Sequence, residues 1–390
     1  MVSISVSVFW TGIFVIFYTY LGYGALLLIL TKIRKKKPPI QKTEHESLPG
    51  VTHIIAAYNE EDFIEEKIKN SLILNYPHEK MALWVVTDGC SDSTPAIVAR
   101  YPQIRLFHSP ERKGKIHAVN RVMKEVTSAV VVFSDANTLL NQDAILNICR
   151  HYSDSKVGGV AGEKRILEKN ADNASGAGEG IYWKYESFLK KKDSELYSIV
   201  GAAGELFSVR TELFEEPPTN MIIEDFYVSL KIASKGYRFL YEPEATATET
   251  ASASVKEEWK RKVRICAGGF QAMGKLVFLL NPFRYGILSL QYISHRVLRW
   301  TLAPLCLALI LIANIILAFH DILIYQIMLA GQGIFYLLAL AGYFLQDKQV
   351  GIKGFFVPYY FSVMNLSVYA GFMRYVKGQQ SVMWERAKRA

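Results

Sequence analysis

The sequence predicts an α/β domain with a mostly parallel sheet, flanked on both sides by transmembrane helices. Two runs predict the sheet: residues 82–88 and 129–135 are short, apolar and rich in β-branched and aromatic side chains. Neither run alternates polar and apolar residues, so both are expected to be buried parallel strands. A third observation predicts the membrane helices. Hydrophobic residues make up 51% of the 390 residues, and they concentrate near the N-terminus and in the last quarter.

The N-terminal segment, residues 1–31, is predicted to be a transmembrane helix. Residues 6–30 form an uncharged apolar run that is long enough to cross a bilayer once. No basic residue precedes this run, whereas Lys32, Arg34 and three further lysines follow it. A cleavable signal peptide carries its charge on the other side, so we interpret the run as an uncleaved anchor. The positive-inside rule then places the domain after the basic linker 32–50 in the cytoplasm, beneath the plasma membrane.

Strands and helices alternate from residue 51 onwards, which indicates a doubly wound sheet. The predicted domain covers residues 51–275, and beyond Gly162 the alternation weakens. A tight turn is expected at 201–204, and a mobile loop at 171–180. The other expected strands are 51–57, 104–107, 157–161 and 206–209, and the expected helices are 60–74, 91–100, 115–126, 181–192 and 222–236.

The C-terminal part is predicted to return to the membrane, with an interfacial segment at 276–295 and membrane helices within 296–373. Apolar runs occupy 300–317, 322–345 and 355–372. Three spans after a cytoplasmic domain would place the C-terminus outside, yet the tail 374–390 carries five basic residues, which argues for the inside. Either 355–372 does not fully cross the membrane or one span is miscounted. We expect a multi-pass protein with a cytoplasmic tail.

The balance of charge also limits the partners. Lys and Arg outnumber Asp and Glu by 45 to 36, giving a net charge of +9, and the basic residues cluster beside the apolar segments. This pattern favours membrane lipids over nucleic acid as the partner. The four cysteines show no paired spacing, so neither a disulfide framework nor a zinc site is indicated.

Asp88 and Asp135 are the main candidate site residues, because each ends a predicted buried strand. Ligands of open α/β sheets bind beyond the carboxyl ends of the strands, and two acids there suit a nucleotide and a metal-bound diphosphate. Asp88, with Tyr58 and Glu60, is the candidate contact of the base and ribose. Asp135, with Asn137 as a weaker neighbour, is the candidate ligand of Mg²⁺ or Mn²⁺. The alternative is that each Asp only caps the helix that follows it.

Further candidates supply charge and a base. Lys115 would place positive charge beside the phosphates, unless it belongs to a solvated basic loop. Asp225 is the candidate general base for an acceptor hydroxyl, and a helix cap is its alternative. Arg261 and Arg264 would contact the diphosphate, or alternatively lipid headgroups at the membrane surface.

The order of these motifs resembles that of the membrane-embedded family 2 glycosyltransferases, the group of cellulose, chitin, hyaluronan and poly-N-acetylglucosamine synthases. The resemblance covers about residues 51–273, and it rests on the order and spacing of several individually weak motifs. The motifs are Ala57-Tyr-Asn-Glu60, Asp88-Gly-Cys-Ser-Asp92, Gly114-Lys115…Asn120, Asp135-Ala-Asn137, Glu224-Asp225 and Arg261…Arg264.

The resemblance implies a GT-A fold and inversion at the anomeric carbon of the donor, a UDP-sugar. By its motif positions, Asp88 would contact the uracil and Asp135 would hold the metal. Asp225 would be the catalytic base, preceded by Glu224 in an intact acid pair. Arg264 would match the arginine of the Gln-x-x-Arg-Trp motif.

Three departures from the family pattern matter. Asn137 replaces the second metal-motif Asp, which weakens metal affinity without removing it, and Ile223 replaces a Thr. Arg261 and Ile265 stand where the processive synthases have Gln and Trp. Ile265 offers no aromatic face for the acceptor sugar, which argues against polymer synthesis.

Two acceptors therefore remain open, a growing polysaccharide and a lipid or lipid-linked saccharide. The absent Trp favours the lipid, whereas several C-terminal spans favour the polymer. A non-catalytic membrane scaffold is a further alternative, against which the retention of Asp88, Asp135 and Asp225 argues. A transporter is disfavoured because the predicted spans lack the acids that mark ion pathways.

Overall fold

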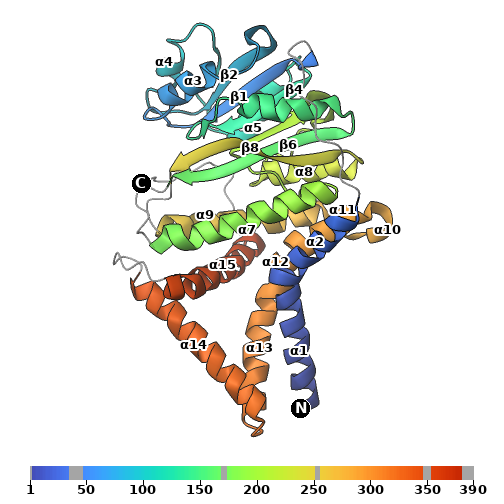
Figure 1. The fold of residues 1–390 in the computed structure, drawn as a ribbon. Coiled ribbons are helices and arrows are strands. Elements are labelled where there is room, and N and C mark those ends of the chain that lie inside the picture. The colour runs from blue at the N-terminus through green and yellow to red at the C-terminus, as the bar shows by residue number, and fades with distance from the viewer. Residues whose placement is uncertain (1, 35–46, 168–173, 251–254, 346–352, 380–390) are drawn as a thin grey trace.

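An eight-stranded sheet forms the centre of the domain, within residues 2–34, 47–167, 174–250, 255–345 and 353–379, which the computed structural model describes (Figure 1). Its strand order is β3-β2-β1-β4-β7-β6-β8-β5. β1 to β4 are mutually parallel, β6 and β8 are parallel to each other, and β7 and β5 are antiparallel to their neighbours. The mostly parallel sheet predicted from the sequence is confirmed. The strands are β1 (Val51–Ala57), β2 (Met81–Asp88), β3 (Arg105–Ser109), β4 (Val130–Asp135), β5 (Leu139–Leu140), β6 (Val157–Leu167), β7 (Leu206–Arg210) and β8 (Arg238–Thr250).

The register of the sheet brings the two strand-end acids to one edge. In β1, Ala57 pairs with Thr87 of β2, and Ala56 pairs with Asp135 of β4. Asp88 and Asp135 therefore lie at the carboxyl ends of two strands that flank β1. Because neighbouring strands are about 4.8 Å apart, the two positions are separated by about 10 Å across the sheet.

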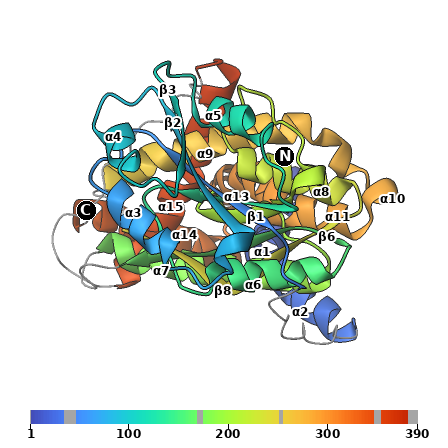
Figure 2. The same ribbon diagram turned by 90° about the horizontal axis from the view of Figure 1, so that it is seen from above.

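Helices cover both faces of the sheet (Figure 2). As a consequence, alternate residues of β1 are buried in cores on opposite faces. Ile54 packs in a core with Val119, whereas Ile55 packs on the other face with Ile64. Both faces of the central strands are therefore dry, which explains their continuous apolar sequences. The covering helices are α3 (Ile64–Leu72), α4 (Thr94–Val98), α5 (Lys115–Met123), α6 (Ala144–Cys149) and α8 (Glu224–Ser234).

A helical layer separates the sheet from the apolar helices below it. Figure 1 shows α7 (Ala174–Leu196) and α9 (Val255–Lys275) in this layer, with α15 (Lys353–Val376) beneath them. The α9–α15 contact is close: a Cβ at Gly371 would lie 2.5 Å from the Cβ of Cys266, and Phe270 packs edge-on against Phe372.

Two sequence expectations fail in this region. The loop expected at 171–180 is wrong for the described part, because α7 already begins at Ala174; residues 171–173 lie outside the described residues. The small residues there, with Ala and Glu among them, continue a helix that the following aromatic segment stabilises by packing. Strand β8, with 13 residues, was missed. It pairs with the extended β6, which is distant in the sequence, so its partner does not follow from neighbouring residues.

Two segments qualify as candidate membrane spans within the described residues, and a bent pair of helices makes a third if its parts form one span. The N-terminal segment Val2–Ile33 comprises α1 (Val2–Phe17), a π-helical turn and α2 (Tyr23–Ile33), and agrees with the predicted anchor. α14 (Leu323–Leu345) is the second. The third is a bent pair, Ile287–Trp300 with α13 (Leu302–Ala318), with an angle of 48° between its parts. α15 is not among the candidates, so the structure does not support a span at 355–372.

The predicted interfacial segment 276–295 is an irregular chain of short helices. Asn281 directly precedes α10 (Pro282–Tyr285), and Gly286 directly precedes α11 (Ile287–Tyr292). Tyr292 is buried against α8, whereas Phe283 is 98% exposed at the tip of the segment. This segment therefore connects the domain to α13 while presenting an apolar side chain outwards.

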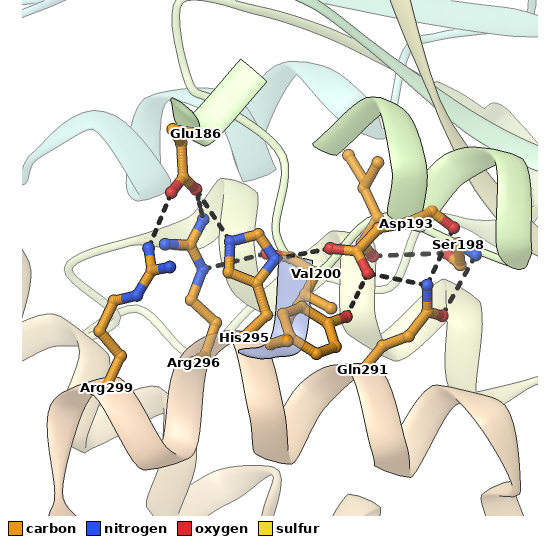
Figure 3. Close-up of polar contacts among 10 residues, drawn as sticks. Glu186, Asp193, Ser198, Val200, Gln291, His295, Arg296 and Arg299 are labelled. Atoms are coloured by element: carbon orange, nitrogen blue, oxygen red, sulfur yellow. Dashed lines mark hydrogen bonds and ion pairs between the residues drawn. The ribbon is translucent and has the colours of Figure 1, made fainter. Parts of the chain in front are cut away.

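A buried polar network fastens the apolar helices to the domain (Figure 3). At its centre, the carboxylate of Asp193 on α7 lies 2.6 Å from Nδ1 of His295 and accepts hydrogen bonds from Gln291, at 3.0 Å, and from the hydroxyl of Tyr23. All four side chains are fully buried. A second carboxylate on α7, that of Glu186, pairs with the side chains of His295, Arg296 and Arg299.

Candidate active site

Asp88 holds the loop that precedes α5. Its Oδ2 accepts hydrogen bonds from the backbone N–H groups of Lys113 and Gly114, at 2.9 and 2.6 Å. Gly114 has a φ of +97°, a conformation that glycine adopts without strain. The Asp88 side chain is buried, and its second oxygen, Oδ1, accepts no hydrogen bond from the described residues. One oxygen therefore orders the loop while the other remains for a ligand.

Tyr58 and Glu60 follow β1 and lie beside the same loops. The guanidinium of Arg112 is 4.0 Å from the centre of the Tyr58 ring, so this ring faces the loop that Asp88 orders. Glu60 is buried; its N–H donates to Oγ1 of Thr94 at 2.8 Å, and its carbonyl accepts from the first residues of α3. The structure thus places both residues between β1 and β2, at the Asp88 side of the edge.

Lys115 joins the carboxylates of two elements. Its Nζ lies 2.8 Å from Oδ1 of Asp135 and 2.9 Å from Oε1 of Glu224, the first residue of α8. The side chains of Lys115, Asp135 and Glu224 are only 19, 22 and 13% exposed. Although burial alone would lower the pKa of Lys115, the two carboxylates hold it well above its usual value. The solvated-loop interpretation of Lys115 is therefore wrong.

Asp225 lies beside this cluster, across Gly204. A Cβ at Gly204 would lie 3.5 Å from Oδ2 of Asp225 and 3.7 Å from Nζ of Lys115, so any larger side chain would enter the space between them. Burial and, next, the charge of Glu224 raise the pKa of Asp225 to about 7, although the charge of Lys115 partly opposes this shift. A carboxylate with such a pKa is suited to accept a proton near neutral pH.

Glu205, which sequence reasoning missed, links the cluster to α9. It forms an ion pair with Lys164 of β6, which also pairs with Glu249 of β8. Burial would raise the pKa of Glu205, but Lys164 and, more weakly, Arg261 hold it well below its usual value. Its charge also acts on Asp225. The only sequence signal was its position directly after the small-residue turn 201–204.

Arg261 and Arg264 lie on α9 in different environments. Arg261 forms two hydrogen bonds with the carboxylate of Glu258, at 2.9 and 3.0 Å. Arg264 has a buried Nε with no hydrogen-bond partner among the described residues. Burying a guanidinium N–H without an acceptor is costly, so this group fits an incoming anion.

The residues around Asp135 fit one divalent cation with a single protein carboxylate. Asp135 uses only Oδ1 in its hydrogen bond with Lys115, and Asn137, half-buried two residues later, hydrogen-bonds no described residue. No group of three or more His, Cys, Asp or Glu that could hold a metal occurs among the described residues. A Mg²⁺- or Mn²⁺-type ion would take its other oxygens from water and a diphosphate, as these ions commonly do.

The sequence of this chain is similar to those of known glycosyltransferases. Residues 52–216 match the glycosyl transferase family 2 domain. The poly-beta-1,6-N-acetyl-D-glucosamine synthase of Staphylococcus aureus (strain MSSA476) is 32% identical over 251 residues, which are 61% of this chain and 58% of the synthase. The synthase of the same name from Staphylococcus epidermidis is 26% identical over 285 residues, 69% of this chain and 64% of that protein. The chain thus spans less than two thirds of the length of these relatives.

A solved structure matches nearly the whole chain. The mannosyltransferase PcManGT from Pyrobaculum calidifontis, in complex with GDP-Man and Mn2+, superposes with a TM-score of 0.74 at 22% identity. The match covers 97% of this chain and 99% of that one. Together with the family match, it confirms the GT-A fold expected from the sequence, with apolar helices at both ends.

Proposed function

We propose, from the match of residues 52–216 to the glycosyl transferase family 2 domain, that the protein is an inverting glycosyltransferase acting at a membrane. One observation carries this proposal: Asp135, Lys115 and Glu224 are in direct contact, with Asp225 beside them, at the sheet edge that also carries Asp88. The acid Asp88 would thus lie near the nucleotide, the Asp135–Lys115 pair near the diphosphate, and the acid Asp225 near the reacting hydroxyl.

Each side chain then has one task. Asp88, Tyr58 and Glu60 would hold the base and ribose of the donor. Asp135, with Asn137, would bind a divalent cation, which when bound would neutralise charge on the diphosphate. Cationic side chains would add to this neutralisation, which favours departure of the diphosphate. They are Lys115, Arg261 and Arg264.

The transfer step requires one base and one leaving group. The acceptor hydroxyl oxygen attacks the anomeric carbon of the sugar, and the bond from that carbon to the diphosphate oxygen breaks with its electron pair staying on the diphosphate. The hydroxyl proton passes to the Asp225 carboxylate, whose raised pKa makes it a competent acceptor near pH 7. Glu224 would keep this pKa high while it positions Lys115. Attack opposite the leaving group gives inversion.

The donor is proposed to be a UDP-sugar. This is supported by the similarity to enzymes named poly-beta-1,6-N-acetyl-D-glucosamine synthases, whereas the solved relative holds GDP-Man. The acceptor is proposed to be a glycan, a lipid or a lipid-linked saccharide. Two features bear on this choice: the absence of an aromatic residue at Ile265, and the apolar helices that lie next to the domain.

The proposed arrangement in the membrane has three spans, formed by Val2–Ile33, the bent pair ending at Ala318, and α14. With α15 lying along α9 rather than crossing, α15 and the catalytic domain share one side of the membrane. The basic residues after the N-terminal span put that side in the cytoplasm. This arrangement would remove the conflict between three C-terminal spans and a basic tail.

Release of nucleotide diphosphate tests the proposed function. The full chain in detergent is incubated with Mn²⁺ and with UDP-sugars or GDP-mannose, and with both glycan and lipid acceptors. We expect release with one donor, and loss of release in Asp225→Asn. Asp143→Asn, a matched change at an exposed hydrogen-bonding Asp, should leave it unchanged. No release from any donor, or equal release by Asp225→Asn, would contradict the proposal.

A further inference from the structure

A large apolar groove opens between the membrane helices directly below the catalytic domain. It has a volume of about 950 Å³ and is lined by residues of α13, α14, α15 and α9. In Figure 1, α13 and α14 meet at one end and diverge towards the domain, where α15 lies across the space between them. The lining residues of α13, such as Leu307 and Leu311, lie near the middle of that helix.

The chemistry of the lining suits a hydrocarbon chain. Leucines, alanines and aromatic rings dominate, including Tyr336 and Tyr343 on α14. A sugar polymer would leave its hydroxyl groups without hydrogen-bond partners against most of such a wall. At the domain end, α9 contributes Lys256 and Trp259, the pair of residue types that commonly marks the membrane–water boundary.

A cluster of lysines lies next to Trp259 on α9. Lys262, three residues later on α9, is 5.4 Å from the ring centre of Trp183 on α7, and Lys164 and Lys190 lie 5.2 and 5.9 Å from the same ring. All three lysines are at most 5% exposed. Lys164 and Lys262 have carboxylate partners.

Lys190 differs from the other two lysines. Among the described residues, no carboxylate lies within ion-pair distance of its Nζ, although its side chain is 4% exposed. A buried ammonium without a counter-charge is unfavourable, and an anionic ligand would relieve this cost. Lys190 therefore offers one positive charge to an anionic headgroup, whereas carboxylates balance the charges of Lys164 and Lys262.

A series of neighbouring and contacting residues links the groove, the lysine cluster and the base. Trp259 in the groove and Lys262 in the cluster are neighbours on α9, because they are three residues apart. Lys164, in the same cluster, pairs with Glu205. Glu205 directly follows Gly204, beside which the Asp225 carboxylate lies.

We infer that the acceptor is an anionic lipid. Its hydrocarbon chain lies in the groove, its phosphate-bearing headgroup binds at Trp183 and Lys190, and its hydroxyl reaches Asp225. This inference rests on the proposed function and specifies its acceptor. A bulk phospholipid that only fills the groove is the competing occupant, and it predicts no glycosylated lipid.

Two lipid probes test the headgroup. The full chain is placed in phosphatidylcholine vesicles containing either phosphatidylglycerol or diacylglycerol. Both have two hydrocarbon chains and a free hydroxyl, and phosphatidylglycerol adds a phosphate that carries a second glycerol. With the donor that supports nucleotide release, we expect sugar on phosphatidylglycerol, detected as a mass shift in the lipid fraction. The preference should fall by about tenfold or more in Lys190→Met, as for loss of one charge-assisted contact. Lys191→Met, at the exposed neighbouring position, should keep it.

Two matched substitutions on α13 test the groove. Ala308 lines it, whereas the neighbouring Leu309 does not, and both are exposed, so neither change should prevent folding. Ala308→Trp should raise the KM for the lipid about tenfold or more while leaving the KM for the donor unchanged. Leu309→Trp should change neither.

The outcomes distinguish failure of the lipid acceptor from failure of the glycosyltransferase function. Nucleotide release with a soluble glycan acceptor, without sugar on either lipid, would overturn the lipid acceptor and keep the glycosyltransferase. So would equal lipid KM values for Ala308→Trp and Leu309→Trp. No nucleotide release with any acceptor would contradict the proposed function itself.

Discussion

Nζ of Lys115 lies 2.8 Å from Oδ1 of Asp135, and the next residue towards the N-terminus, Gly114, donates its backbone N–H to Asp88. The first turn of α5 therefore connects the two acids that end β2 and β4. Neighbouring residues of one short segment thus hold both halves of the proposed donor site. A change at Lys115 should disturb charge near the diphosphate without breaking the loop that Asp88 holds.

Replacing Lys115 tests this separation. In Lys115→Met, the carboxylates of Asp135 and Glu224 lose the cation between them, and repulsion between like charges increases. We expect kcat/KM for the donor to fall at least about a hundredfold, a loss typical of removing a charged contact in a buried site. Lys115→Arg should recover part of it, and Lys113→Met, at the exposed neighbour, should have little effect. Steady-state kinetics would contradict the assignment if Lys113→Met and Lys115→Met were equally active.

The pH dependence of transfer follows from Asp225. Its carboxylate must be ionised to accept a proton, and burial with the charge of Glu224 raises its pKa to about 7. Below that pH the protonated form predominates, so kcat/KM should fall about tenfold for each further pH unit. Glu224→Gln removes a negative charge and should shift this acidic limb to lower pH. Glu216→Gln, at an exposed site, serves as the control; an unshifted limb in Glu224→Gln would refute the coupling.

Local patterns predicted the edge of the sheet well, because buried parallel strands have continuous apolar sequences and a ligand edge follows from their direction. Asp88 and Asp135 were found in this way, and the register confirms that they share an edge. Glu205 and Lys164 were not found. Their pairing joins β6 to the segment before β7, and no local sequence pattern encodes such a contact.

The last helix shows a similar limit. Residues 355–372 are apolar enough to suggest a span, yet α15 packs along α9 through Gly371, where the two backbones approach closely. Hydropathy indicates whether a helix is apolar enough to contact lipid. Whether the helix instead packs on another part of the protein depends on how well the two surfaces fit together. The same limit applies to the lysines around Trp183, which come from three separate elements.

Metal affinity should respond to Asn137. Asp135 alone offers one carboxylate to a divalent ion, and an amide at position 137 is a weaker ligand than a second carboxylate. We expect chelation of divalent ions to abolish transfer and Mn²⁺ to restore it. Asn137→Asp should lower the Mn²⁺ concentration needed for half-maximal activity by about tenfold, whereas Asn141→Asp, outside the cluster, should not. Activity that persists in a chelator, or an unchanged Mn²⁺ requirement in Asn137→Asp, would count against metal binding at this position.

Asp193 should matter for stability rather than for transfer chemistry. It is fully buried and holds His295, Gln291 and Tyr23, which belong to the apolar helices that it joins to α7. Asp193→Ala leaves these groups buried without their acceptor, which costs about 3–5 kcal/mol for a broken buried charge pair. The midpoint of thermal unfolding in detergent should fall by about 6 °C or more. Glu195→Ala, on the same helix but 41% exposed and, within the described part of the chain, paired only with Lys192, should lower it by less than about 2 °C. Equal midpoints for Asp193→Ala and Glu195→Ala would mean that apolar packing alone, and not this network, attaches the domain to the membrane helices.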